Sequence, residues 1–138
     1  MGRTHRSVAQ RRSLVLRTIY ALCLLGATYN HWAAIVQHGF LWNPGGFPRA
    51  SIFFWAMLAV FDPTAAILLF KRPNAGVAAT AAIIVIDVIH NVWIQARYFP
   101  PLLHGLAGAP QVVEQIVFMM FVAMTAPFAW TSKAPVTS

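Results

Sequence analysis

Three acidic residues are the most unusual chemical feature of this 138-residue sequence, because each lies within or at the end of an apolar segment. They are Asp62, Asp87 and Glu114. An aspartate at the centre of a membrane-spanning helix costs roughly 2.5 to 3.5 kcal/mol. Such a carboxyl group is therefore expected to face other protein groups and to have a partner or a proton there. These acids are the first candidates for a functional site.

The spacing of Asp87, His90 and Asn91 places three polar side chains on one face of a helix, because residues three and four positions apart are neighbours on a helix surface. A carboxylate beside an imidazole can move a proton or hold a ligand. We therefore predict Asp87 and His90 as catalytic residues for proton transfer on an apolar substrate, with His90 as acid or base and Asp87 orienting it. The alternative is an interhelical hydrogen-bond network that only fixes helix packing, at about 0.6 kcal/mol per bond.

Further polar side chains are predicted to complete an intramembrane pocket that opens toward the outer side of the membrane. A helical projection of the first apolar segment groups Asn30 with Cys23 and Gly26 on the inward face. His31 lies on the flank of that face. We expect the pocket to bind a small or lipidic molecule. The predicted ligand-binding residues are Asn30, His31, Asn91, Glu114 and Asp62.

Two of these acids also have structural explanations. Pro63 follows Asp62 directly and removes a backbone hydrogen bond, so the helix should bend and the carbonyl of Ala59 needs another donor. Glu114 lies close after Pro110, and an acid in the first turn of a helix complements the helix dipole. A lone carboxylate at mid-membrane is equally what a proton-coupled carrier would use.

Cofactor binding is a further alternative that the sequence leaves open. His31 and His90 lie on different apolar segments at comparable depth, an arrangement that would suit a heme with two axial histidines. A metal held by these histidines with Asp87 and Glu114 is a weaker idea, because di-iron bundles use a paired motif and only one Asp-x-x-His occurs here. No metal site is predicted, and the cofactor and any enzymatic activity stay undetermined. A structural or assembly subunit of a membrane complex is another alternative function.

Four apolar runs are long enough to position these side chains as membrane-spanning helices. About 20 helical residues cross a hydrocarbon core of about 30 Å. None of the runs alternates apolar with polar residues, as a membrane β-barrel must. The sequence thus predicts an all-α integral membrane protein, a four-transmembrane-helix bundle forming a single domain over 1–138, with helices at about 16–37, 51–70, 75–96 and 111–131. The tight basic turn at 71–74 makes the second and third helices antiparallel neighbours.

Composition and charge agree with a multi-pass protein of the cell membrane, plasma or inner. Hydrophobic residues make up 59% of the chain and charged residues 9%, whereas a soluble domain has roughly a quarter of its residues charged. The net charge of +7 is concentrated in the basic segment 1–15 and near other helix ends, so it indicates topology beside anionic lipid and not nucleic acid binding.

The distribution of Lys and Arg also predicts the orientation of the chain. Only Arg49 and Arg97 fall on one side of the predicted membrane, and the other basic residues fall on the opposite side. By the positive-inside rule, the N- and C-termini are both cytoplasmic. The pair Arg11 and Arg12 also suits a twin-arginine export signal, but three more apolar segments follow it. The expected partners are the lipid bilayer, a small-molecule or lipid ligand, and a second copy or another membrane subunit.

Overall fold

The computed structural model describes residues 2–99 and 110–130, with side chains from residue 7 onward. This part of the chain contains no strand. It forms four helices, each long and apolar enough to cross a membrane. They are α1 (Gly2–His38), α2 (Arg49–Lys71), α3 (Pro73–Tyr98) and α5 (Pro110–Ala129). The prediction of an all-α bundle of four transmembrane helices is therefore confirmed.

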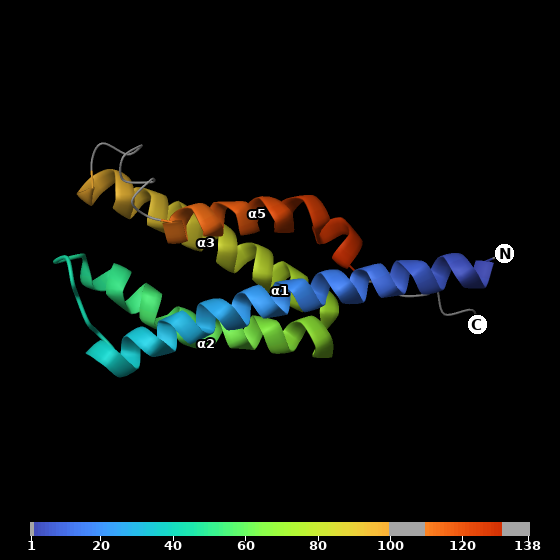
Figure 1. Ribbon diagram of the computed structural model, residues 1–138, viewed down its shortest axis with the longest axis horizontal. Coiled ribbons are helices and arrows are strands. Elements are labelled where there is room, and N and C mark those ends of the chain that lie inside the picture. The colour runs from blue at the N-terminus through green and yellow to red at the C-terminus, as the bar shows by residue number, and fades with distance from the viewer. Residues whose placement is uncertain (1, 100–109, 131–138) are drawn as a thin grey trace.

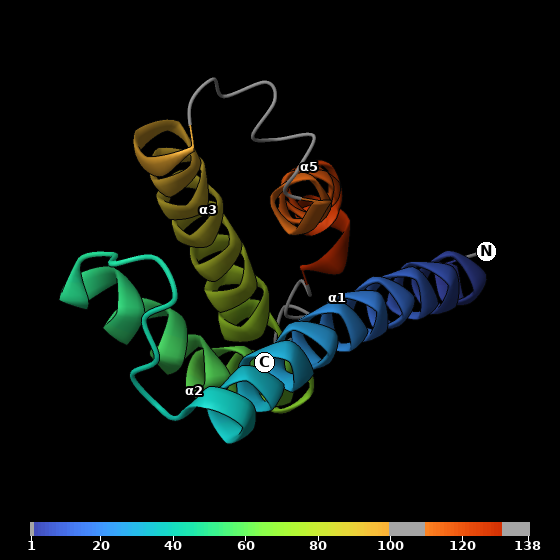
Figure 2. The ribbon, with the colours of Figure 1, turned by 60° about the vertical axis from the view of Figure 1, so that its left-hand side comes forward.

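Helix α1 is much longer than the apolar run that predicted it. It contains 37 residues, which span about 55 Å at about 1.5 Å per residue. Its N-terminal end extends past the other three helices in both views (Figures 1 and 2). The basic segment 1–15 contains no proline and no glycine after Gly2, and arginine is a good helix former, so nothing in it stops the helix.

The helices pack in chain order around the bundle. Helix α1 lies along α2, α2 along α3, α3 along α5, and α5 returns to α1, whereas α1 and α3 meet only slightly across the diagonal. Helix α2 ends at Lys71 and α3 begins at Pro73, which confirms the predicted tight turn. A Cβ atom on Gly76 would overlap the backbone of Leu68 and Leu69. Glycine therefore permits the close approach of α2 and α3 directly after the turn.

The inward face of α3 follows the predicted pattern. Asp87 is buried, as are Gly76 and Thr80 on the same face, whereas Val85 and Ile89 on the opposite face are exposed. A helix with polar groups on one side and β-branched side chains on the other has only one orientation that shields the polar groups.

The predicted inward face of α1 is wrong. Cys23, Gly26 and Asn30 are exposed, and the buried positions are instead Leu16, Tyr20 and Leu24, on the flank where His31 also lies. The physical reason is that large side chains fill the space between α1 and α5. The ring of Tyr20 is fully buried against the edges of Phe118 and Phe121, and its hydroxyl lies 2.6 Å from Thr125 Oγ1.

Two polar residues of α1 bind the C-terminal ends of neighbouring helices. Ser13 Oγ donates to the carbonyl of Ala129 at 2.7 Å, at the end of α5. Arg17 Nη1 donates to the carbonyl of Leu69 at 2.7 Å, in the last turn of α2. The last carbonyls of a helix have no intrahelical partner and favour a cation. Arg17 is therefore part of the buried core and not of the exposed N-terminal charge. Both described chain ends lie at the same end of the bundle.

Candidate functional site

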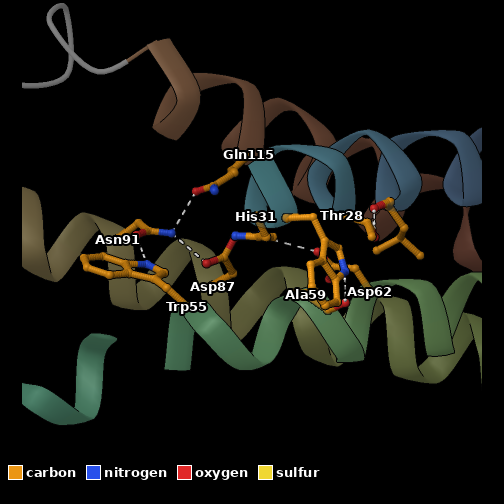
Figure 3. Close-up of polar contacts among 10 residues, drawn as sticks. Thr28, His31, Trp55, Ala59, Asp62, Asp87, Asn91 and Gln115 are labelled. Atoms are coloured by element: carbon orange, nitrogen blue, oxygen red, sulfur yellow. Dashed lines mark hydrogen bonds and ion pairs between the residues drawn. The ribbon is translucent and has the colours of Figure 1, made fainter. Parts of the chain in front are cut away.

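The interior polar side chains form a network centred on Asn91 of α3 (Figure 3). Its Nδ2 donates to Asp87 Oδ1 at 2.7 Å and to Gln115 Oε1 of α5 at 3.1 Å. The indole Nε1 of Trp55 on α2 donates to Asn91 Oδ1 at 2.9 Å. Both halves of the Asn91 carboxamide are therefore engaged, and one residue links three helices.

A second polar contact joins α1 to α2. His31 Nε2 lies 3.7 Å from Asp62 Oδ2, and the exposed fraction is 22% for the His31 side chain and 4% for that of Asp62. In Figure 3 the His31 ring lies between the side chains of Asp62 and Asp87. The two contacts thus belong to one polar region, to which all four helices contribute.

In the structure, Asp87 and His90 bond to different partners. The carboxylate of Asp87 accepts from Asn91, one turn further along α3. The His90 ring turns toward α2, where its Nε2 lies 2.9 Å from Ser51 Oγ. Although the two residues share a helix face, the choice of partner depends on side-chain rotamers and on the neighbouring helix, which helical spacing does not determine.

His90 occupies an aromatic environment. Its ring centroid lies 4.7 Å from that of Phe54, 5.2 Å from that of Trp55 and 6.2 Å from that of Trp93. Its Nδ1 atom is buried without a hydrogen-bond partner in the part of the chain that the structure describes. The imidazole is therefore held by one hydrogen bond and by ring packing.

Two predicted ligand-binding residues lie apart from this region. Asn30 and Glu114 both have exposed side chains, on α1 and α5 respectively. Gln115, the residue after Glu114, is the one that joins the network, because successive residues point about 100° apart around a helix. Sequence reasoning missed Gln115, although an amide near the start of an apolar segment is a signal that could have identified it.

A hollow of about 170 Å³ lies between α1 and α2, beside the polar region. Two residues of the polar region, His31 and Trp55, line it. The rest of its lining is largely apolar and aromatic and includes Ala34, Ile35, Phe40, Trp42, Ile52 and Ala56. Of the five residues predicted to bind a ligand, only His31 lines this hollow.

The loop between α1 and α2 forms part of this lining. Trp42 stacks on His38 with ring centroids 3.9 Å apart. The side chain of Asn43 binds both backbone polar groups of Phe47, at 2.9 Å and 2.8 Å. Gly39 adopts a φ of 94°, which favours glycine, directly after the end of α1. These contacts fix the loop against the end of α1.

Comparisons with protein-family models, curated proteins and solved structures found no match for this chain. The functional argument therefore depends on the site itself. Among residues 7–99 and 110–130, no three His, Cys, Asp or Glu side chains converge as a metal ion would require. The metal site considered from His31, Asp87, His90 and Glu114 is thus not assembled in the structure.

Proposed function

We propose that this multi-pass membrane protein binds a small, largely apolar molecule, or one end of a lipidic molecule, in the hollow between α1 and α2. The main observation is that His31 and Trp55 line the hollow and also contact two polar groups of the interior, buried Asp62 and half-buried Asn91. Ligand sites typically combine mostly apolar walls with a few well-placed polar groups. The hollow has this composition.

The size of the hollow narrows the class of ligand. Pockets for drug-sized molecules measure about 300 to 1,000 Å³, whereas an apolar cavity of about 150 Å³ holds benzene. At about 170 Å³, the hollow matches one ring or the end of one chain. A longer lipidic molecule would place only its terminal group beside His31 and leave the remainder outside.

The polar groups determine which terminal group fits. An imidazole can donate or accept a hydrogen bond, and the carboxyl group of Asp62 lies behind it. A ligand with a hydroxyl or carbonyl group at its tip would satisfy His31 while its apolar part contacts Phe40, Ile52 and Ala56.

Proton transfer to or from such a ligand is a second candidate function, and the contact between His31 and Asp62 is the observation that favours it. A carboxylate orients an imidazole and stabilises its charged form. In this proposal His31 exchanges the proton and Asp62 positions it. The acid–base pair therefore differs from the pair predicted from the spacing of Asp87 and His90.

Native mass spectrometry of the protein, released from its own membrane, tests ligand binding. We expect the wild-type protein to carry a bound small molecule or lipid that an Ala34→Phe variant lacks, because the larger ring fills the hollow. Ala78→Phe, on the exposed face of α3, is the matched control and should retain the molecule. Equal retention in all three proteins would contradict the proposal.

A second variant separates loss of binding from loss of folding. His31→Leu preserves the approximate volume of the side chain but removes its hydrogen-bonding group. We expect it to lower the bound fraction several-fold while circular dichroism reports the same helix content as the wild type. Undiminished binding in His31→Leu together with loss in Ala34→Phe would show that the ligand does not depend on the imidazole, and it would exclude proton transfer through His31.

A further inference from the structure

Asn30 presents a polar side chain on the exposed face of α1 at the middle of the bundle. The next two residues establish its depth, because His31 contacts Asp62 and Trp32 contacts Ala59, both close to the centre of α2. Asn30 has no hydrogen-bond partner among the side chains and backbone that the structure describes over residues 7–99 and 110–130. Hydrocarbon offers a carboxamide no partner at this depth, so a lipid-facing Asn30 is unfavourable.

The backbone of α1 is open to close approach beside Asn30. Gly26 precedes Asn30 by four residues and Cys23 precedes it by seven, so the three lie along one stripe of the helix. A Cβ atom on Gly26 would meet nothing within 4 Å. Cys23 is exposed as well. Transmembrane helices associate through small residues that let backbones meet and through polar side chains that bond across the contact.

We infer that a second copy of this chain packs against α1 along Asn30 and Gly26. The self-complementarity of Asn30 selects this occupant, because a carboxamide has one donor group and one acceptor group and can pair with an identical carboxamide. Copies inserted with the same topology must lie parallel, related by a two-fold axis along the membrane normal. Asn30 then meets the partner's Asn30, and the helices cross near Gly26.

The proposed pairing of two α1 helices can be detected through Cys23. Cys23 is the only cysteine in the sequence, and in the parallel pair it faces the partner's Cys23. Treatment of native membranes with a short bifunctional maleimide should therefore yield a product of twice the 15.2 kDa chain mass. The matched control carries Cys23→Ser with Ala78→Cys, which moves the thiol to the exposed face of α3. We expect this control to remain a single chain.

Two variants test the contact itself. Gly26→Leu adds a side chain where the single chain has open space, so it should leave folding unchanged but reduce the Cys23 cross-linked fraction at least tenfold. Asn30→Leu removes the polar pairing and should reduce that fraction several-fold. The inference is overturned if Cys23 reacts no more than the α3 control, if both variants cross-link like the wild type, or if the product contains a different polypeptide.

Discussion

The indole Nε1 of Trp32 donates a hydrogen bond to the carbonyl oxygen of Ala59 at 3.2 Å. That carbonyl is the one that Pro63, four residues later on α2, cannot satisfy, because proline has no N–H. A side chain of α1 therefore replaces a missing backbone bond of α2. The need for a donor at Ala59 follows from the sequence, but the identity of the donor required the structure.

We expect Trp32→Phe to lower the free energy of unfolding by about 1 kcal/mol through loss of this bond. Pro63→Ala restores an N–H that can bond to Ala59, so the same Trp32 substitution should cost less in that background. Reversible unfolding in mixed detergent micelles measures both steps of this double-mutant cycle. Equal costs in the two backgrounds would show that Trp32 acts only through packing.

The contact between Arg17 and the carbonyl of Leu69 predicts a charge-specific effect on stability. Arg17→Met keeps much of the apolar stem but removes the charged donor at the end of α2. Hydrogen bonds to charged groups contribute about 1.5 to 3 kcal/mol, and we expect a destabilisation in that range. Arg11→Met, at an exposed position of the same helix, is the control and should change the unfolding free energy little.

Two glycines should respond oppositely to the same substitution. Gly76→Ala forces a methyl group into the backbone of Leu68 and Leu69, and overpacking of this kind costs about 1 to 3 kcal/mol. Gly26→Ala enters open space and improves helix propensity, so at detergent levels that keep chains apart it should be neutral or stabilising within about 1 kcal/mol. Similar effects at the two positions would contradict the close approach of α2 and α3.

The network around Asn91 predicts that replacing Asn91 alone destabilises the protein more than replacing Asn91 and Asp87 together. Asn91→Leu leaves the buried Asp87 carboxyl without its donor, and we expect a loss of about 1 to 3 kcal/mol in unfolding free energy. The double variant with Asp87→Leu should recover part of that loss, because it leaves no stranded carboxyl group. Asp87→Asn should be mild, since an amide oxygen can still accept from Asn91. Additive losses in the double variant would mean that the bond contributes nothing.

Sequence reasoning predicted the helices and much of the orientation of α3. The reason is that long apolar runs have only one membrane-compatible structure, and the polar residues Asp87 and Asn91 can be shielded only on one side of their helix. The turn at Lys71 and the Ala59 carbonyl without an intrahelical donor follow from equally local rules about chain length and proline.

The rotation of α1 about its axis and the pairing of side chains could not be predicted from the sequence by such local rules. Asn30 and Tyr20 both offer polar groups, and only the complementary rings on α5 show that Tyr20 is the buried one. Likewise, the partner of Asp87 depends on which helix lies opposite, a relation between distant segments that no single-helix projection contains. Gln115 was missed for the same reason, because its bond to Asn91 depends on α5 lying beside α3.

The bond from Ser13 to Ala129 joins positions 116 residues apart, and this separation constrains biogenesis. During synthesis the first helix reaches the membrane long before the last, so the Ser13 hydroxyl cannot donate to the Ala129 carbonyl until α5 has arrived. A chain stalled after three helices would also leave Tyr20 facing lipid with its hydroxyl unpaired. The first helix therefore differs chemically between finished and unfinished molecules, because the Ser13 and Tyr20 hydroxyls meet their partners only when α5 is in place.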